Sequence, residues 1–331
     1  MFPFIASLLL ALVAPHPTAA ADRDWQEFPA LISLSVVDGV VHARTGPDSS
    51  GHVLEMIHNP KTRRWSRSEL VVGEATGAPE PKRLDQVLVF NGGLFDQFRD
   101  RDRIDLGGAF VLAKSDTGFA LLENGENRGW PIVTEGDLDR WGSEVRLGLP
   151  RDYPEDQLRI LLATGRLTNV PGPFVRVGDQ LWFGLAGGFA GSEGQLGGLV
   201  VYDIRERSFR VVRHKFIADV AVTRLLAVGD ELWIGTGRFA SSRLGGLRGL
   251  LLHRPKRREW RQFSPENSRI SGDLIDDALA EGRHLWVTTN QGISRYDLDH
   301  RLWSSWYWHR DDDGGFELTR ERPVDLAREF N

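Results

Sequence analysis

Cysteine is absent from the 331 residues of this sequence. Its absence excludes disulfide bonds, thiolate metal sites, cysteine nucleophiles and a lipid-modified amino-terminal cysteine. Three motifs of catalytic or metal sites are absent as well, namely His-x-His, His-Glu-x-x-His and Gly-x-Ser-x-Gly. The sequence therefore predicts no metal site and no cofactor. It leaves enzymatic activity undecided, with a non-enzymatic role favoured.

Long runs of one charge sign are also missing. The formal net charge is -5, spread along the chain, and lysine is scarce beside arginine. A nucleic-acid-binding surface needs a concentrated basic patch, so no nucleic-acid partner is expected. Hydrophobic residues make up 41% and charged residues 26% of the chain, values that are typical of a soluble globular protein.

The apolar run at the amino terminus, from Phe4 to Val13, is too short for a membrane span, which needs about 20 apolar residues. Prolines and the small residues Ala19 to Ala21 follow it, directly before Asp22. This order is typical of a secretory signal peptide at residues 1–21, although no lysine or arginine precedes the apolar run. An uncleaved anchor is the alternative. We expect an exported protein, periplasmic or secreted, whose mature chain has no membrane span.

Glycine and tryptophan are abundant, with 36 and 11 residues. Repeated tight turns and aromatic strand positions would account for both. One pattern occurs twice in residues 180–263: a Leu-Trp-x-Gly segment, a Gly-Leu segment and a closing aromatic residue. Trp182 and Trp233 are 51 positions apart, and so are Phe209 and Trp260. A constant offset of this kind indicates an internal repeat.

The same pattern extends in both directions along the chain. A clear last copy runs from His284 to Trp303, and a weaker first copy ends at Trp65. In a second, degenerate copy the segment from Leu106 to Ala113 is expected to be one strand. Each closing aromatic residue lies seven positions after a Tyr, His or Leu. The pairs are His58 and Trp65, Leu112 and Phe119, Tyr202 and Phe209, His253 and Trp260, and Tyr296 and Trp303.

Four short strands in each copy of about 45 residues predict an all-β fold, a β-propeller of four-stranded blades, at residues 22–306. Six blades are favoured, and seven or five are the alternatives, as is a β-solenoid or open array. One blade is expected between about residues 127 and 168, with strands at 145–149 and 158–162. Residues 307–331 are expected to form a carboxy-terminal tail, in which 315–319 closes the ring by joining the first blade.

Two segments carry a family resemblance. Leu232-Trp-Ile-Gly-Thr236 and Leu285-Trp-Val-Thr-Thr-Asn-Gln-Gly-Ile-Ser-Arg-Tyr-Asp297 resemble the two-component-regulator propeller repeat, which occurs in periplasmic sensor regions and in exported bacterial propellers. Streptogramin lyase, a propeller enzyme, is a more distant look-alike. The resemblance covers residues 228–263 and 281–306 well, 177–213 partly, and the rest weakly. It implies the propeller fold and leaves the function open, because the shared residues are structural.

The loops between the second and third strands of the blades all open on one face of a propeller. Three of these loops are long: Asn91 to Asp105, Leu185 to Gln195, and Thr236 to Gly246. Exposed aromatic and charged side chains on one face would form a recognition surface. Ordinary surface loops whose phenylalanines pack back on the disc are the alternative. The predicted ligand-binding residues are Phe95, Phe98, Arg101, Phe189, Glu193, Arg238, Phe239 and Arg243.

Other groups of residues have competing interpretations. The repeated Trp and Tyr are expected to pack between blades, with carbohydrate stacking as the alternative. The aromatic segment 303–313 is expected to pack the last blade on the first, with a sugar platform as the alternative. In residues 96–105 arginines alternate with the acids, so solvated ion pairs are favoured over a calcium site. If the protein is an enzyme, His214 and His284 are the best candidates for a general base.

The function expected from these observations is binding. The protein is predicted to be an exported propeller that contacts an unidentified protein or small ligand outside the cytoplasm through its long loops, and to be a monomer. The alternative is a propeller enzyme, a lyase or hydrolase acting on a small molecule or carbohydrate, with a polar site at the central funnel. A scaffold that contacts another envelope protein through a blade face is a third hypothesis.

Overall fold

The computed structural model describes residues 29–46, 51–71, 101–115, 118–132, 170–185, 197–217, 220–237, 248–310 and 315–320. The predicted signal peptide and the strands predicted at 145–149 and 158–162 lie outside these residues. Within the described part of the chain, no helix is long and apolar enough to cross a membrane.

The described residues form five antiparallel sheets, four of them with four strands and one with five. The first two sheets contain β1 (Leu31–Val37), β2 (Val40–Thr45), β3 (His52–Asn59) and β4 (Arg64–Val71), then β5 (Arg103–Gly107), β6 (Phe110–Ser115), β7 (Gly118–Glu123) and β8 (Glu126–Asn127). The next two contain β9 (Pro171–Val177), β10 (Gln180–Leu185), β11 (Leu199–Asp203) and β12 (Ser208–Val212), then β13 (Ala221–Val228), β14 (Glu231–Gly237), β15 (Leu250–Arg254) and β16 (Glu259–Phe263), with the short 3-10 helix η2 (Pro255–Arg257) between β15 and β16. The last contains β17 (Ile275–Glu281), β18 (His284–Thr289), β19 (Gly292–Asp297), β20 (Leu302–Arg310) and β21 (Phe316–Thr319).

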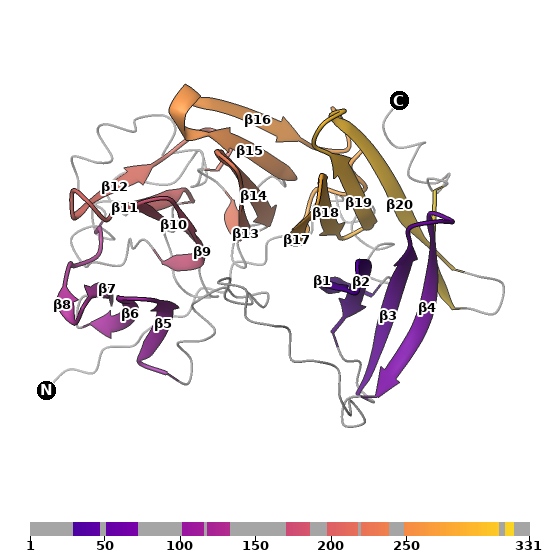
Figure 1. Cartoon of the computed structure of the whole chain (residues 1–331), viewed down its shortest axis with the longest axis horizontal. Coiled ribbons are helices and arrows are strands. Elements are labelled where there is room, and N and C mark those ends of the chain that lie inside the picture. The colour runs from indigo at the N-terminus through magenta and orange to yellow at the C-terminus, as the bar shows by residue number, and fades with distance from the viewer. Residues whose placement is uncertain are drawn as a thin grey trace, which may run out of the picture.

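The sheets stand around a common centre, as Figure 1 shows. The strands β1, β9, β13 and β17 lie innermost; β13 contacts both β9 and β17, and β17 contacts β1. Each sheet is a meander of neighbouring strands, so the chain moves outward within a sheet and then returns to the centre. This arrangement is a β-propeller, which confirms the predicted fold class. Five sheets are described, and the blade predicted between about residues 127 and 168 lies mostly outside them.

The seven-residue step of the repeat is a hairpin. Tyr202 lies directly opposite Phe209 across the β11–β12 ladder, and His253 lies opposite Trp260. His58 and Trp65 form the same cross-strand pair in the first sheet. Facing side chains in adjacent strands are close enough to pack, so the repeat preserves one aromatic pair in each hairpin.

The hairpin turns explain why the repeat carries charged residues there. In four of them the last turn residue is an arginine in the left-handed conformation, with φ between 49° and 56°. The preceding side chains support the turn, as in the last sheet, where Asp297 Oδ1 accepts hydrogen bonds from the Asp299 and His300 amides at 3.1 and 2.9 Å. Asp203 and Asn59 cap their turns in the same way. The four arginines are Arg63, Arg207, Arg258 and Arg301.

The glycine at the start of the third strand has a steric role. Gly249 and Gly292 have φ values of 72° and 145°, and a Cβ atom at either position would collide with the backbone of the adjacent fourth strand. Glycine adopts such conformations without the penalty that a side chain brings. The Gly-Leu element of the repeat is therefore required by the backbone.

The second sheet departs from the predicted strands. The segment 106–113, predicted to be one strand, is divided by a turn between β5 and β6, where Gly107 and Gly108 have φ values of 93° and 63°. Phe119 accordingly faces Lys114, and Leu112 faces Leu121. The prediction was wrong here because the Leu-Gly-Gly sequence resembles the Gly-Leu element of the better copies, whereas its two glycines form a hairpin turn.

The repeated tryptophans lie in the core, as predicted. Trp182, Trp233 and Trp286 occupy equivalent positions on second strands, and each is at most 2% exposed. They belong to apolar clusters that join neighbouring sheets. Burying side chains of this size contributes a large part of the hydrophobic stabilisation, so these residues stabilise the ring and do not form an open carbohydrate platform.

The last sheet packs on the first through the aromatic residues of β20. Trp306 and Trp308 are buried in one cluster with Leu31 and Met56 of the first sheet. The prediction of a packing seam at the start of segment 303–313 is confirmed for these two side chains. β20 runs through residue 310, beyond position 306, and β21 extends this sheet by pairing with β20 while it also contacts β4 of the first sheet.

Candidate binding face and the centre of the ring

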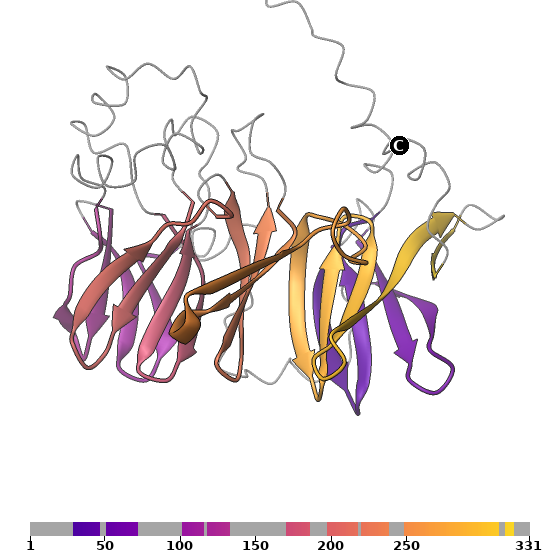
Figure 2. The same ribbon diagram turned by 90° about the horizontal axis from the view of Figure 1, so that it is seen from above.

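The two faces of the disc differ in the length of their connections. On one face, which we call the turn face, the first strand of each described sheet joins the second and the third joins the fourth through two to four residues. These tight turns follow the lower edge of the disc in Figure 2. On the opposite face, which we call the loop face, β10 joins β11 through residues 186–198 and β14 joins β15 through 238–249. The connection from β16 to β17, which is described throughout, also lies on the loop face.

Most of the predicted ligand-binding residues lie outside the described part of the chain. These are Phe95, Phe98, Phe189, Glu193, Arg238, Phe239 and Arg243. Arg101 is described, and it is exposed directly before β5. Segment 91–105 was predicted to join the second and third strands of a blade. Its described end instead leads into β5, which is the first strand of its sheet. A chain that enters a first strand does so at the loop face, so the correction leaves Arg101 on the predicted face.

The described acidic residues of segment 96–105 have structural partners. Asp102 Oδ1 lies 3.3 Å from Lys114 Nζ, and both side chains are exposed. Asp105 Oδ1 accepts a hydrogen bond from the Gly107 amide at 2.8 Å. These contacts are a surface ion pair and a turn cap, as favoured over calcium coordination.

Three inner strands carry a β-bulge of one residue at equivalent places, and β9 has a register shift between Pro171 and Phe174, also close to its start. The extra residues are Ile32 in β1, Thr223 in β13 and Asp276 in β17, each close to the start of its strand. First strands start at the loop face, so the three bulges lie near the loop-face end of the centre. Bulges re-aim side chains and often lie beside functional sites. The bulged residues therefore occupy equivalent positions near the centre of the ring, but their side chains differ from sheet to sheet: one is apolar, one is a hydroxyl and one is a carboxyl group.

Asp277 connects three inner strands. Its Oδ1 atom lies 2.9 Å from Arg224 Nε of β13, and its Oδ2 atom accepts a hydrogen bond of 2.8 Å from the Leu34 amide of β1. Burial raises the pKa of Asp277, and the Arg224 guanidinium and two backbone amides oppose that shift. A buried carboxylate that keeps a guanidinium and amide partners is well satisfied, so Asp277 has a structural role in holding the ring together.

Asp276 has no such partners. It is 9% exposed, and its Oδ2 atom has no hydrogen-bond partner among the described residues. Burial, together with the neighbouring Asp277, raises the pKa of Asp276 to about 7. A carboxyl group with this pKa exchanges a proton near neutral pH and could act as a general acid or base. Sequence analysis missed it, although adjacent acids in an otherwise apolar inner strand were a visible signal.

The two histidines named as candidate bases lie in different surroundings. The His214 ring stacks on Trp260 with centroids 4.5 Å apart, and its Nδ1 atom accepts a hydrogen bond from the Phe216 amide at 3.3 Å. The structure therefore places His214 in a packing role. His284 lies at the turn face, at the other end of β17 and β18 from Asp276.

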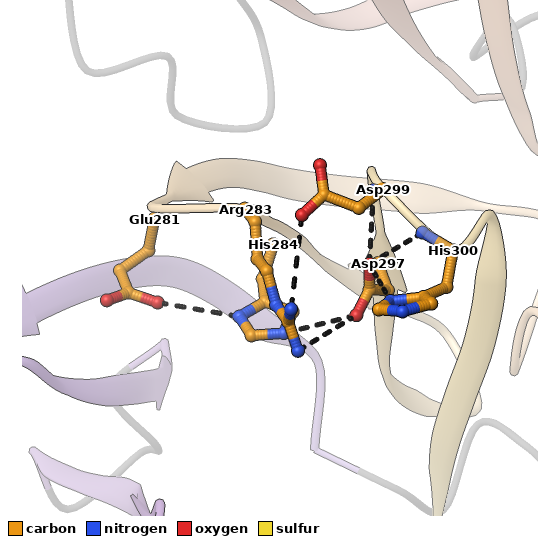
Figure 3. Close-up of polar contacts among 6 residues, drawn as sticks. All are labelled: Glu281, Arg283, His284, Asp297, Asp299 and His300. Carbon is orange, nitrogen blue, oxygen red and sulfur yellow. Dashed lines mark hydrogen bonds and ion pairs between the residues drawn. The ribbon is translucent and has the colours of Figure 1, made fainter.

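Figure 3 shows the polar groups around His284. Its Nδ1 atom lies 4.0 Å from Glu281 Oε2, and its Nε2 atom lies 3.8 Å from Asp297 Oδ2, so both carboxylates are beyond hydrogen-bond distance. Burial lowers the pKa of His284, which keeps the imidazole neutral at neutral pH. Asp297 instead binds the turn and the His300 ring, and these hydrogen bonds lower its pKa to about 2. The structure does not bring His284 together with the carboxylates at the centre of the ring.

No protein-family model and no curated protein matches this sequence. Among solved structures, the chain is similar to the extracellular domain of the putative one component system BT4673 from B. thetaiotaomicron, with 12% identity, coverage of 88% of this chain and 31% of that chain, and a TM-score of 0.36. It is also similar to the GH74 xyloglucanase from Xanthomonas campestris, with 11% identity, coverage of 89% and 52%, and a TM-score of 0.36. The Niastella koreensis GH74 enzyme gives 10% identity, coverage of 83% and 38%, and a TM-score of 0.37. The chain spans about a third to a half of these larger proteins, and no function is taken from them.

Proposed function

We propose that this chain is an exported β-propeller that acts as a binding module, with the loop face as its contact surface. The difference between the faces carries this proposal. Every described turn-face connection within a sheet is short, whereas the variable sequence of the repeat is concentrated in the connections of the loop face. Loops placed by a rigid scaffold are the usual location of binding residues. The partner is a protein or a small ligand outside the cytoplasm, and the chain acts as a monomer.

Site-specific crosslinking tests the contact surface. A photoreactive amino acid would replace Phe189 or Phe239, which are predicted to lie on the loop face, and Lys256, which is exposed in the β15–β16 turn, would be replaced in a matched control. We expect discrete adducts, formed in cells that produce the protein, from the two loop-face positions and none from the control. Adducts from Lys256 alone, or no adduct from either loop position, would contradict the proposal.

The mature amino terminus tests export separately. Signal-peptide cleavage after Ala21 would leave a chain that begins at Asp22. Intact-mass measurement of the protein recovered outside the cytoplasm should give the mass of residues 22–331. A full-length protein retained inside the cell would contradict export, and it would leave the crosslinking result valid.

A second candidate function is favoured by Asp276. Its unpartnered carboxyl group near the centre of the ring supports the alternative of a lyase or hydrolase with a site at the centre. A panel of chromogenic glycosides and esters should then reveal an activity that Asp276→Asn removes and that Glu317→Gln, an exposed change on β21, retains. Absence of turnover with the intact protein across this panel would count against the enzyme hypothesis.

A further inference from the structure

A pocket lies between the last and first sheets at the turn face, away from the proposed contact surface. Its volume is about 320 Å³, at the lower end of the range for small-molecule sites. The first sheet contributes Val41, His58 and Pro60, and the last sheet contributes Trp286, Arg295 and the β17–β18 turn. The walls are therefore partly apolar, and they also carry two imidazoles, His58 and His284, two guanidiniums, Arg283 and Arg295, and the Glu281 carboxyl group.

His58 is the first unusual group of this pocket. It is 3% exposed, and its Nε2 atom has no hydrogen-bond partner among the described residues. The ring packs among Trp286, Trp65 and Trp306, with centroids 4.8, 5.1 and 5.5 Å away. Burial, and then the charge of Arg295, lowers the pKa of His58 to about 4, so the ring is neutral at neutral pH. A buried polar atom left unpaired is costly, so a ligand group that hydrogen-bonds to Nε2 would remove this cost.

Arg295 is the second unusual group. Its guanidinium carbon lies 5.5 Å from the Trp286 ring and 5.9 Å from the Trp306 ring, and the side chain is half-buried. Burial lowers its pKa, and the nearby arginines Arg63 and Arg320 add to this effect. In the described residues no carboxylate lies within ion-pair distance of Arg295. A desolvated guanidinium of this kind favours an anionic partner.

The neighbouring sheets show that Arg295 departs from the repeat. Arg295 lies opposite Trp286, and the equivalent residues opposite Trp182 and Trp233 are Val201 and Leu252. Both of these are buried and apolar. The fourth strand differs in the opposite sense, because Ser304 of the last sheet stands where Arg210 and Arg261 stand in the two preceding sheets. In the last sheet, therefore, the arginine is on the third strand, and a small serine occupies the fourth-strand position where the two preceding sheets have an arginine.

We propose that this pocket binds a small ligand with a carboxylate on a short apolar body, with Arg295 holding the carboxylate, His58 Nε2 hydrogen-bonding to the ligand and Trp286 packing against the body. Glu281, an acidic residue, lines the same pocket, and the guanidinium of Arg283 in this lining already has an ion-pair partner in Asp297 at 3.5 Å. Glu281 should disfavour a doubly charged phosphate more than a singly charged carboxylate. The inference does not depend on the loop face, since the two sites lie on opposite faces of the disc.

Three ligands that share one ring test the head group: phenylacetate, phenyl phosphate and benzyl alcohol. Titration calorimetry on the mature chain should give a Kd for phenylacetate below about 1 mM. We expect benzyl alcohol to bind at least tenfold more weakly, and phenyl phosphate to bind more weakly than phenylacetate. Equal affinity for the acid and the alcohol, or no binding of phenylacetate, would overturn the site. Tighter binding of the phosphate would overturn the choice of a carboxylate.

Variants locate the binding site. Arg295→Gln should weaken phenylacetate binding at least tenfold, whereas the matched control Arg261→Gln, on the exposed fourth strand of the preceding sheet, should leave it unchanged. If Arg295→Gln does not fold, Glu281→Gln at the pocket rim gives an independent answer, because it should strengthen phenyl phosphate binding at least threefold. Unchanged affinities in the variant that folds would place the ligand elsewhere.

Discussion

Two interfaces between neighbouring sheets, which we call seams, have the same histidine and tryptophan packing but differ in their polar groups. Between the sheet of β9–β12 and the sheet of β13–β16, His253 packs against Trp182 and Trp260, and its Nδ1 atom has a partner in the Glu259 carbonyl at 3.2 Å. Between the last and first sheets, His58 packs against Trp286 and Trp65 in the same way. There, however, the buried imidazole Nε2 atom has no hydrogen-bond partner among the described residues, and His58 lines a pocket that also contains Arg283 and Arg295. The residues shared by the copies of the repeat form the packing. The residues that differ between copies, such as Arg295, are where a ligand can be bound.

Removing the shared tryptophan should give the largest effect and should distinguish the seams. We expect Trp182→Ala to lower the free energy of unfolding by about 3–5 kcal/mol, because it empties a filled core site. Trp286→Ala should cost less, since one side of Trp286 already borders a pocket. Urea denaturation of both variants measures the difference. Equal losses of unfolding free energy in the two variants would show that the pocket does not weaken the packing between the last and first sheets.

The unpartnered carboxyl group of the last sheet should make stability depend on pH. The folded-state pKa of Asp276 is raised from 3.8 to about 7, so above about pH 4 the folded chain holds a proton that the unfolded chain has released. Stability contributed by this group is therefore lost as the pH rises to about 7 and beyond. Asp276→Asn should stabilise the protein by up to about 4 kcal/mol at pH 8 and by little at pH 4, as followed by thermal unfolding. A gain that is independent of pH would contradict the raised pKa.

The two histidines allow a matched comparison. His253→Phe should destabilise the protein by about 1 kcal/mol at pH 8, because it removes a buried ring that has a hydrogen-bond partner. His58→Phe should be neutral or slightly stabilising at the same pH, since it removes an unpaired polar atom. Chemical denaturation at pH 8 would detect the difference, and a larger loss for His58→Phe would show that this seam needs the imidazole.

Acid should affect both histidines in the same way. The folded-state pKa of each is lowered from 6.5 to about 4, so between these values the unfolded chain binds protons that the folded chain does not. Their contribution to stability is lost as the pH falls through this window, by up to about 3 kcal/mol for each group. Both phenylalanine variants should therefore flatten the pH dependence between pH 7 and pH 4. An unchanged slope would contradict the lowered pKa values.

The smallest predicted effect concerns the hairpin turns that the seams share. Arg258 adopts a left-handed conformation with φ of 54° and lies at an exposed turn. Arg258→Gly should raise the melting temperature by a few degrees, equivalent to at most about 1 kcal/mol, because glycine avoids the left-handed penalty but loses more chain entropy. Arg261→Gly, in the regular strand β16, is the control and should lower it.

Sequence periodicity predicted the fold because the repeat is built from backbone requirements. Tyr202 and Phe209 face each other across a hairpin, and this geometry fixes the seven-residue step that the sequence displays. The same reasoning failed at Gly107 and Gly108, since two glycines are compatible both with a strand entry and with a turn. Local patterns cannot distinguish these cases without the pairing partners.

The candidate sites were less accessible to sequence reasoning. His284 was named as a candidate base from its type alone, whereas His58 was named only as the residue seven positions before Trp65. The two line one pocket, although 226 positions separate them in the chain, because the last sheet packs on the first. Arg295 carries a signal that could have been read, since the aligned residues Val201 and Leu252 are apolar. Comparing the copies position by position identifies such departures, but only the fold shows which of them meet.

The indole N–H signals of the tryptophans provide the most direct test of the central claim, that the last–first seam binds a ligand where the other seams only pack. In a phenylacetate titration followed by NMR, the signal of Trp286 should shift and saturate with a single Kd. The signals of Trp182 and Trp233, which occupy the same repeat position in other seams, should stay in place. Equal shifts of all three signals, or no shift of Trp286 at saturating ligand, would contradict this account.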